Sequence, residues 1–396
     1  MHICHAHPSS DLREGGVVRY VFDLSEQLAQ RGHDVSELTL DPPNADIVHP
    51  EQSQLVSHIT SLSIGSNHAL WLNKQQIARA KEKLSKASVL HIHGMWSPHM
   101  VHLAEIAIGM GIPYVVTVHG MLDEVCLRKG WLKKRVFMRL CGNRFLARAQ
   151  RVITSSLGEQ AQVRRWLREP NSIVLPPAMD LDAYIDLPNP DIAADRFDLD
   201  RRQCPVILFL SRLHPKKGIE HLIDAARILS DRGTHCTVVI AGTGDPAYEA
   251  ALRKRVASCD LQDMIHFVGM VDGELKRSLY ACATVFALPT SQENFGLVLT
   301  ESCACGTPVI TTRGVDIWQE LSAAGAAVIV EQSGQGFADA ICSMIADPKQ
   351  SELMGQKGRD WVLNTFAIPT VLPQYEQMYS DIIGPNTQKA IKNACV

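Results

Sequence analysis

The sequence lacks several features that would place it in a specialised class of proteins. No stretch approaches 18 uninterrupted apolar residues, so we expect no helix that crosses a membrane. The N-terminus shows no charged leader before a long apolar core, which argues against a signal peptide and favours a cytoplasmic location. The formal net charge is only -3, so binding of nucleic acid by the whole surface is not indicated. The remaining composition, 46% hydrophobic and 20% charged residues, is typical of a soluble globular protein.

Cysteine frameworks and metal-ligand spacings are also missing. The 11 cysteines follow no repeating pattern and their number is odd, which favours reduced thiols. Histidines alternate along two predicted strands, His5 with His7 and His91 with His93, but no carboxylate or cysteine completes a recognisable zinc spacing. We therefore expect no metal and no other bound cofactor.

The chain of 396 residues is longer than one core usually serves, and its patterns fall into two series. Strand and helix signals alternate from His2 to Thr154 and again from Val206 to Thr312. Between the two series, the segment from Leu175 to Asp200 is rich in Pro, Asp and Asn, and we expect the interdomain linker there.

Alternating strands and helices predict the α/β class, with two Rossmann-like doubly wound domains that face a cleft. We expect an N-terminal domain over residues 1–185 and a C-terminal domain over residues 200–360. A last helical pattern predicts that residues 365–390 return to the first domain, and we expect the polar tail after Pro385 to fray.

The strongest local signal is the segment Pro289 to Leu297, which contains Glu293, followed by Glu301 in an otherwise apolar helix. A carboxylate in such a helix should have a partner, because burying it alone is expensive. If the helix starts near Gly296, backbone amides form an anion site at its positive end that suits a diphosphate. Those amides belong to Asn294, Phe295, Gly296 and Leu297. The alternative is a simple strand-to-helix turn with Glu301 on a solvated face.

A second signal places cations where a predicted strand ends and a helix begins, in the segment Phe209 to Gly218. Arg212 offers a planar fork and Lys217 a compact charge, which together suit a leaving diphosphate. A solvated basic turn is the alternative, since exposed lysine pairs are common.

Three further signals are weak when taken alone. Gly15 and Gly16 follow the first strand and permit close approach of the backbone to a ligand, but they do not form G-x-G-x-x-G. Gly242 either flanks a nucleotide base or simply makes a turn. His119 closes the predicted strand Tyr114–His119 and either binds a sugar or is a satisfied structural histidine.

Residues 128–151 carry nine basic side chains and no acidic one, with Trp131, Leu132, Val136, Phe137 and Leu140 at helical spacing among them. A long amphipathic basic helix of this kind suits an anionic membrane surface or a lipid-phosphate acceptor. The alternative is an ordinary helix whose apolar side is core and whose charged side is solvated.

In order and spacing, these segments resemble the retaining GT-B glycosyltransferases of family four, over nearly the whole chain. Glu293 and Glu301 reproduce the E-x7-E motif of that family, and Arg212 with Lys217-Gly218 matches its R-x4-K-G segment. Gly15-Gly16 matches its first glycine loop, and His119 matches its N-domain histidine. The segment from His119 to Asp123 is similar to members that build bacterial polysaccharides.

The resemblance implies roles for these residues. Arg212 and Lys217 would grip the donor diphosphate, while Glu301 would bind the ribose and Glu293 the donor sugar. Gly16 would lie near the phosphate and His119 near the sugar. Transfer would retain configuration without a metal, and the acceptor would be a glycan or lipid-linked glycan. We prefer UDP over GDP as the carrier.

Three other functions compete with this one. An NAD-dependent enzyme needs a glycine fingerprint and an acidic ribose ligand, which neither series shows. A sugar-nucleotide epimerase or a phosphorylase shares the two-domain architecture, and the joint pattern of Arg212, Lys217, Glu293 and Glu301 disfavours it. A non-catalytic glycan-binding protein would retain the fold without turnover.

Overall fold

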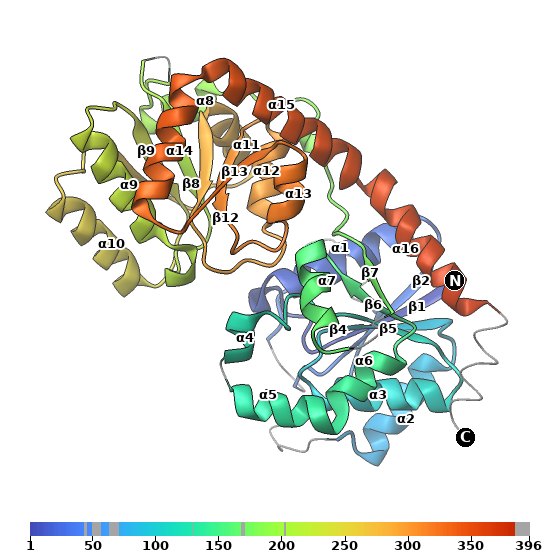
Figure 1. Ribbon diagram of the computed structural model, residues 1–396. Helices are drawn as coiled ribbons and strands as arrows, with labels where there is room; N and C mark the ends of the chain where they lie inside the picture. The colour runs from blue at the N-terminus through green and yellow to red at the C-terminus, as the bar shows by residue number, and fades with distance from the viewer. Residues whose placement is uncertain are drawn as a thin grey trace. The chain divides into compact units, whose positions relative to one another are not determined.

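The computed structural model describes residues 1–42, 46–49, 57–62, 71–128, 130–167, 171–201 and 203–384. The tail after Pro385, which we expected to fray, lies outside these residues. The chain forms two compact units (Figure 1). The first contains Met1–Ala178 and the chain from Ile368 on, and the second contains Met179–Ala367.

The first unit is built on a seven-stranded parallel sheet with the order β3-β2-β1-β4-β5-β6-β7. Because the order reverses between β1 and β4, the sheet is doubly wound, as expected. The strands are β1 (His2–His7), β2 (Asp34–Thr39), β3 (Ile59–Ser61), β4 (Val89–His93), β5 (Tyr114–Thr117), β6 (Arg151–Thr154) and β7 (Ser172–Val174).

Helices cover both faces of this sheet (Figure 1), and side chains alternate between the faces because a strand has a period of two. On β4, Leu90 and Ile92 join one buried cluster, whereas Val89 joins the other. His5 and His91 lie opposite each other on β1 and β4 and share the face of Val89. The helices are α1 (Gly16–Gln30), α2 (Lys74–Leu84), α3 (Pro98–Gly109), α4 (Glu124–Arg128), α5 (Trp131–Phe137), α6 (Asn143–Arg148), α7 (Leu157–Arg164) and α16 (Ile368–Ile383).

The C-terminal helix α16 packs on the first unit, as the sequence predicted. Its apolar face fills the cluster that contains Ile3 and Val89. The hydroxyl groups of Tyr375 and Tyr20 lie 2.5 Å apart, and the Glu376 carboxylate pairs with the Arg31 guanidinium at 2.8 Å. The buried residues of α16 are Val371, Leu372, Tyr375, Met378, Tyr379 and Ile382.

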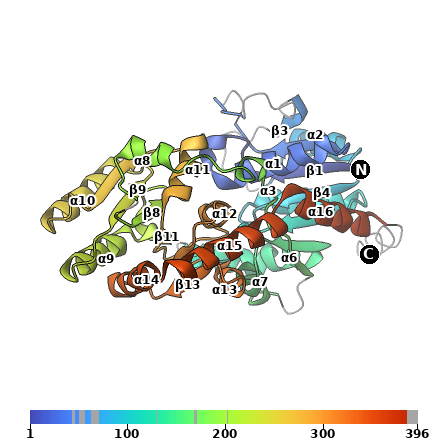
Figure 2. The ribbon, with the colours of Figure 1, turned by 90° about the horizontal axis from the view of Figure 1, so that it is seen from above.

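The second unit repeats the doubly wound arrangement, with the sheet order β10-β9-β8-β11-β12-β13 and a reversal between β8 and β11. Figure 2 shows α9 beside α14, which pack closely. The strands are β8 (Val206–Leu210), β9 (Thr237–Ala241), β10 (Ile265–Gly269), β11 (Val285–Leu288), β12 (Val309–Thr312) and β13 (Ala327–Val330). The helices are α8 (Asp191–Phe197), α9 (Ile219–Asp231), α10 (Pro246–Ser258), α11 (Gly273–Cys282), α12 (Leu297–Ala304), α13 (Trp318–Ala323), α14 (Gly334–Ala346) and α15 (Pro348–Thr365).

Most of the stretch expected to be a linker is part of the second unit. Its apolar residues, including Leu181, Ala193 and Leu199, are buried in the core of that unit. The Ser278 hydroxyl also accepts a hydrogen bond from the Ala193 amide at 2.9 Å. The proline-rich composition gave no sign of this packing, because the buried positions are few and widely spaced. Where the chain enters the unit, the Met179 amide donates to the Phe366 carbonyl at 2.8 Å.

Candidate active site

The first candidate element is the loop between β11 and α12, which carries Glu293. The loop ends at Gly296, whose φ of 72° is left-handed, and a Cβ there would lie 2.9 Å from Leu299 Cδ1. A glycine therefore allows α12 to begin at Leu297, as the sequence predicted. Among the described residues no side chain caps the N-terminus of α12, so the positive end of the helix dipole lies at Gly296 and Leu297 without a capping group. Phe295 is buried against Phe366, and Leu297 is 47% exposed.

The side chains of Lys217 and Glu293 meet in an ion pair at the carboxyl ends of β8 and β11. Lys217 is buried and its side chain is 9% exposed, compared with 21% for Glu293. The two loops are held together by their backbones, because the Ser291 amide donates to the Lys216 carbonyl at 2.8 Å. Gly218 follows in a left-handed turn, where a Cβ would overlap the Pro289 carbonyl oxygen. The pair lies at the reversal of strand order, where open α/β sheets bind ligands.

Arg212 lies just beyond the end of β8 and is exposed. Among the described residues, no ion pair of Arg212 is found, so its guanidinium is available to an anion. The backbone on either side of Arg212 is fixed, since the Ser211 amide donates to the Ala241 carbonyl and the Leu213 amide donates to the Thr243 carbonyl. A Cβ at Gly242 would overlap the Ser211 carbonyl oxygen. The glycine thus permits the close approach of these two loops.

Glu301 lies one turn into α12 and has the partners that the apolar surroundings predicted. Its carboxylate accepts hydrogen bonds from Lys276 Nζ at 2.8 Å and from the Tyr280 hydroxyl at 3.2 Å, both on α11. The side chain is 18% exposed, so the alternative of a solvated face is wrong. Burial, followed by the charge of Glu301, raises the pKa of Tyr280 well above its usual range. Lys276 and Tyr280 were not predicted, because nothing in the spacing of α11 marks them.

In the first unit, β5 ends at Thr117, two residues before the expected end at His119. The reason is the backbone of His119 and Gly120, with φ of 52° and 68°, which turns the chain out of the strand. The Gly120 amide donates to the carboxylate of Glu159, which is fully buried and also accepts from the Ser155 amide at 2.6 Å. Desolvation raises the pKa of Glu159. Sequence reasoning missed Glu159, whose position in α7 shows no motif.

A row of hydrogen-bonded imidazoles leads from His119 into the unit. His119 Nε2 lies 3.0 Å from His93 Nδ1, and His93 Nε2 lies 2.9 Å from His5 Nδ1. Burial lowers the pKa of His5 to about 4 and that of His119 to about 3, and holds that of His93 well below its usual range. The imidazoles are therefore neutral at pH 7.

One nitrogen of each of His5, His91 and His93 lies within 4.8 Å of the others, in a fully buried group. The alternation of histidines thus does bring the rings together. The nitrogens of His91 already pair with the hydroxyls of Tyr379 and Thr117, each at 2.7 Å. These hydrogen bonds account for most of the ring nitrogens, while His5 Nε2 has no partner among the described residues.

Gly15 and Gly16 form the turn between β1 and α1. Gly15 has a φ of 106°, and a Cβ at either glycine would meet no atom within 4 Å. The backbone here is therefore open to approach. As in α12, no side chain caps the N-terminus of α1.

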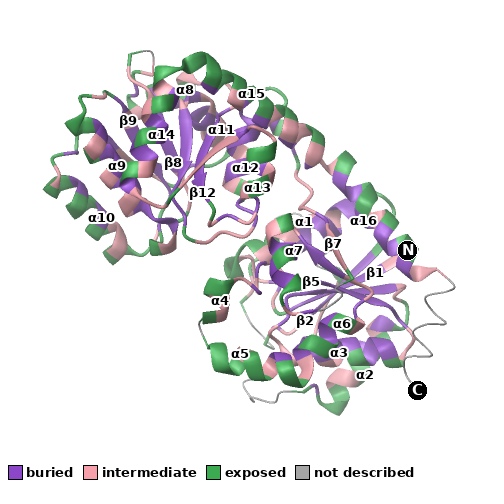
Figure 3. Ribbon diagram, in the orientation of Figure 1, coloured by how far each residue is buried: buried purple, intermediate pink, exposed green. Residues whose placement is uncertain are grey.

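The basic segment 128–151 is not one regular helix. Gly130, with a φ of 70°, separates α4 from α5, and a π-helical turn over Met138–Gly142 joins α5 to α6. Lys129 lies outside the described residues. Figure 3 shows α5 as largely exposed. The four exposed apolar side chains are Trp131 (58%), Leu132 (60%), Val136 (48%) and Leu140 (77%).

These four side chains are not core, so the alternative of an ordinary helix is wrong at these positions. It is right at Phe137, which is partly buried and packs against the core of the first unit. Among the basic residues, Arg148 and Arg144 pair with Glu105 at 2.8 and 3.9 Å. Lys133, Arg135 and Arg139 are exposed and form no ion pair with the described residues.

Two family models match the chain and between them span most of it. The model described as glycosyltransferase family 4 matches residues 14–183, and the model described as glycosyl transferases group 1 matches residues 191–361. The chain belongs to the family 4 glycosyltransferases. This chain is therefore a transferase, and the alternative of an NAD-dependent enzyme is wrong.

Curated relatives and solved structures agree with the family. The glycogen synthase of Mycobacterium tuberculosis is 26% identical over 413 residues, which cover 92% of this chain and 91% of the relative. The GDP-mannose-dependent alpha-(1-6)-phosphatidylinositol monomannoside mannosyltransferase of the same organism is 32% identical over 200 residues, covering 48% of this chain and 50% of the relative. HepE of Anabaena, in complex with UDP, has a TM-score of 0.78 at 18% identity and covers 96% of this chain and 100% of that one. The last likeness shows the GT-B fold.

Within the described part of this glycosyltransferase, no helix is both long and apolar enough to cross a membrane.

Proposed function

We propose that this family 4 glycosyltransferase moves a sugar from a nucleotide diphosphate sugar to a glycan or lipid-linked glycan, with retention of configuration, in cell-surface polysaccharide synthesis. UDP is the preferred carrier over GDP. The observation that supports the proposal is the contact of buried Lys217 with Glu293 at the reversal of strand order in the second unit. Positive charge, a carboxylate and the uncapped N-terminus of α12 converge there.

In the proposed reaction, the bond between the anomeric carbon and the diphosphate oxygen breaks, and the acceptor oxygen bonds to that carbon on the same face. The acceptor proton passes to the departing phosphate. Negative charge grows on the diphosphate, where Arg212 and Lys217 stabilise it most strongly. Lys217 has three N–H donors, so it can retain Glu293 and still bind a phosphate oxygen. We assign the neutralisation of charge to these side chains and to α12 rather than to a metal.

The carboxylate of Glu301 is assigned to the ribose hydroxyls. Lys276 and Tyr280 hold it from one side, and a carboxylate has about four lone-pair sites, so acceptor capacity remains for a diol. Glu293 is assigned to the hydroxyls of the donor sugar and Gly242 to the base. Gly15 and Gly16 are assigned to close approach of a phosphate.

His119 is assigned to a sugar hydroxyl. Its Nε2 pairs with His93, which leaves Nδ1 for a ligand. Because burial lowers the pKa of His119, the ring acts as a neutral hydrogen-bonding group at pH 7.

Donor hydrolysis and thermal shift against UDP-, GDP- and ADP-sugars test the proposal. A bound donor raises the apparent stability by mass action, even when it is not hydrolysed. We expect one donor to shift the wild type and to fail with Lys217→Ala, Arg212→Ala and Glu293→Ala. Lys254→Ala, which removes an exposed lysine of α10, is the matched control and should keep the shift. A protein that responds to free glycans or to NAD but to no nucleotide sugar would overturn the proposal. NMR of the product anomer tests retention.

We assign the exposed surface of α5 and the π-helical turn to peripheral contact with an anionic membrane that carries the lipid-linked acceptor. Apolar and cationic side chains stand exposed together there, as on helices that lie in a bilayer interface. Each cation near such a surface contributes about 1 kcal/mol. Neutralising Lys133, Arg135 and Arg139 should therefore weaken binding to anionic liposomes by about 3 kcal/mol, measured by flotation. Unchanged flotation would remove the reason for a membrane-bound acceptor.

A further inference from the structure

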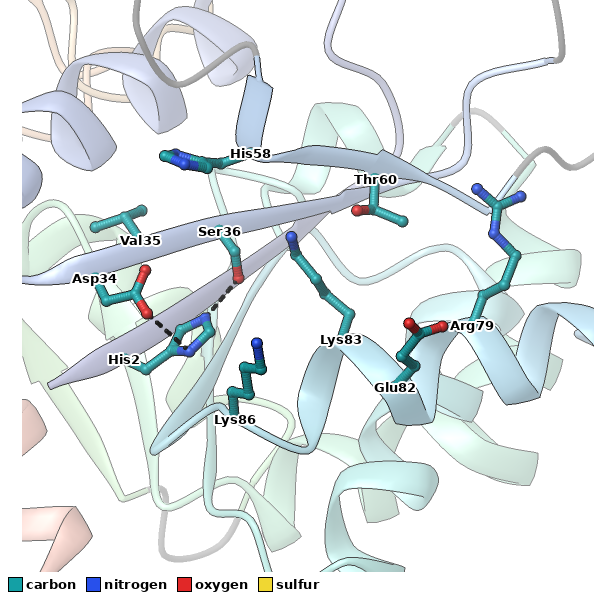
Figure 4. A pocket seen from close by; sticks show the side chains of 10 residues that line it. All are labelled: His2, Asp34, Val35, Ser36, His58, Thr60, Arg79, Glu82, Lys83 and Lys86. Carbon is teal, nitrogen blue, oxygen red and sulfur yellow. Dashed lines mark hydrogen bonds and ion pairs between the residues drawn. The ribbon is translucent and has the colours of Figure 1, made fainter.

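A cavity of about 450 Å³ opens in the first unit at the amino ends of β1, β2 and β3 (Figure 4). Helix α2 forms its other wall. Because the six residues of β1 make five steps of about 3.3 Å, the cavity lies about 17 Å along the strand from its carboxyl end, where the chain continues to Gly15 and Gly16. It is therefore separate from the candidate active site of this unit.

One face of α2 supplies most of the charge. Arg79, Glu82 and Lys83 line the cavity, and their spacing of three and four residues places them on one side of the helix axis. Lys86, in the turn that follows α2, lines the cavity beside them. Figure 4 shows the Lys83 and Lys86 ammonium groups extending from that wall toward the strands. Arg79, Lys83 and Lys86 form no ion pair with any of the described residues. Such a cluster of cations leaves the cavity ready for an anion.

The opposite wall, formed by the strands, is polar, and some of its polar groups are already paired with one another. His2 Nε2 lies 2.9 Å from the buried Ser36 hydroxyl, and His2 Nδ1 lies 3.3 Å from Asp34. Burial lowers the pKa of His2, Asp34 opposes this, and Lys83 and Lys86 lower it further, so the imidazole adds no positive charge at pH 7. The anion-binding charge is thus that of Arg79 and Lys83 on α2 and of Lys86 in the turn after the helix.

Helix stability alone does not explain this arrangement. Lysines in the last turn of a helix interact favourably with its dipole, and α2 has two there, Lys81 and Lys83. Both lysines interact equally with the helix dipole, yet only Lys83 lines the cavity. Arg79, one turn before it, and Lys86, beyond the end of α2, line the cavity as well. Lys81 is therefore a natural control for Lys83.

The lining also limits the chemistry of the ligand. Among the described residues that line the cavity, Val35 is the only apolar one and imidazoles are the only aromatic rings, so these residues offer a nucleobase little surface for stacking. Hydroxyl groups of Ser36 and Thr60 and the carboxylates of Asp34 and Glu82 can bind sugar hydroxyls. The volume exceeds that of inorganic phosphate and falls within the range of small-molecule sites.

We propose that this cavity is a binding site for a phosphorylated monosaccharide, with the phosphate between Lys83, Lys86 and Arg79 and the sugar hydroxyls against Asp34 and Glu82. The site is separate from the donor site and would let the enzyme sense a sugar phosphate. It goes beyond the proposed transfer reaction and does not depend on it.

Isothermal titration of the full chain at low salt, with glucose 6-phosphate, glucose and inorganic phosphate as probes, tests the site. We expect glucose 6-phosphate to bind more tightly than either of the other two. The double change Lys83→Gln with Lys86→Gln should weaken binding of glucose 6-phosphate at least about tenfold, since two charge-assisted hydrogen bonds are lost. Lys81→Gln, in the same helical turn, should leave it unchanged.

Lys217→Gln separates this site from the donor site. It should abolish the response to the nucleotide sugar and leave binding of glucose 6-phosphate intact. Loss of glucose 6-phosphate binding in Lys217→Gln but not in the double variant would place the ligand in the donor site and overturn the proposal. Equal affinity for inorganic phosphate and glucose 6-phosphate would overturn the assignment to a sugar, and no binding would overturn the site.

Discussion

Mild acid should destabilise the first unit far more than the second. All fully buried histidines among the described residues belong to the first unit. Burial keeps the folded-state pKa values of His5, His91, His93 and His119 below the unfolded value of 6.5, and Glu37, which raises the pKa of His5, does not reverse the direction. Below pH 6.5 the unfolded chain therefore binds protons that the folded chain does not, and stability falls as the pH falls.

The size of the effect follows from the number of groups. For each buried imidazole, the free energy of unfolding falls by about 1.4 kcal/mol per pH unit below pH 6.5. The fall continues until the pH reaches the folded-state pKa, which is about 4 for His5 and about 3 for His119. Four such groups lose about 5 kcal/mol between pH 7.5 and 5.5. Glu159 acts in the opposite direction, because desolvation raises its pKa and so favours proton uptake by the folded chain, which offsets part of this loss. A loss of several kcal/mol is a large part of typical domain stability, which is about 5–15 kcal/mol.

Hydrogen exchange followed by mass spectrometry in increasing urea, at pH 7.5 and 5.5, measures this loss in each unit of one molecule. Peptides from β1, β4 and β5 should lose protection at much lower urea at the acid pH, after correction for intrinsic exchange rates. Peptides from β8 and β11 serve as the internal reference. Equal shifts in both units, or a loss below about 1 kcal/mol in the first, would refute the description of the imidazoles as buried and neutral.

Other predictions concern single residues. Gly218→Ala should lower the free energy of unfolding, measured by thermal denaturation, by at least about 3 kcal/mol, because the new Cβ strains a left-handed backbone and also overlaps the Pro289 carbonyl. Gly233 has a similar φ but open space around it, so Gly233→Ala should cost only about 1–2 kcal/mol. Glu301→Gln should raise the donor KM about tenfold or more with little change in kcat, and a change in kcat alone would contradict the ribose assignment. Glu159→Gln should lower the melting temperature by an amount equivalent to about 1–3 kcal/mol, because its new NH2 group must face the N–H of either Gly120 or Ser155; an unaltered melting curve would contradict this account.

The sequence predicts the fold well because hydrophobic runs and glycines mark each strand and turn. Gly296 marks the start of α12, and the apolar pattern of the last helix marks its return to the first unit. The proline-rich region from Leu175 to Asp200 was harder to interpret, because a few buried residues are enough to attach it to the second unit.

The site was predictable residue by residue but not pair by pair. Both Lys217 and Glu293 stand in recognisable motifs, yet their contact joins positions 76 residues apart, which no local pattern encodes. The partners of Glu301 come from another helix, and the left-handed turn at His119 and Gly120 is joined by a hydrogen bond of the Gly120 amide to the distant carboxylate of Glu159. Such contacts arise from the tertiary structure rather than from local periodicity.

The return of α16 to the first unit also fixes an order of events during synthesis. The cluster around Ile3 and Val89 needs side chains from α16, and the His91 imidazole needs the Tyr379 hydroxyl. A ribosome must therefore complete the whole second unit before the first can close, although the second unit is continuous in sequence and can fold as soon as it emerges. In this enzyme the unit that is translated first is the one that finishes last. Chains released before residue 368 would keep α1 on this face of the first sheet but would leave the apolar residues that α16 covers exposed to chaperones or to aggregation.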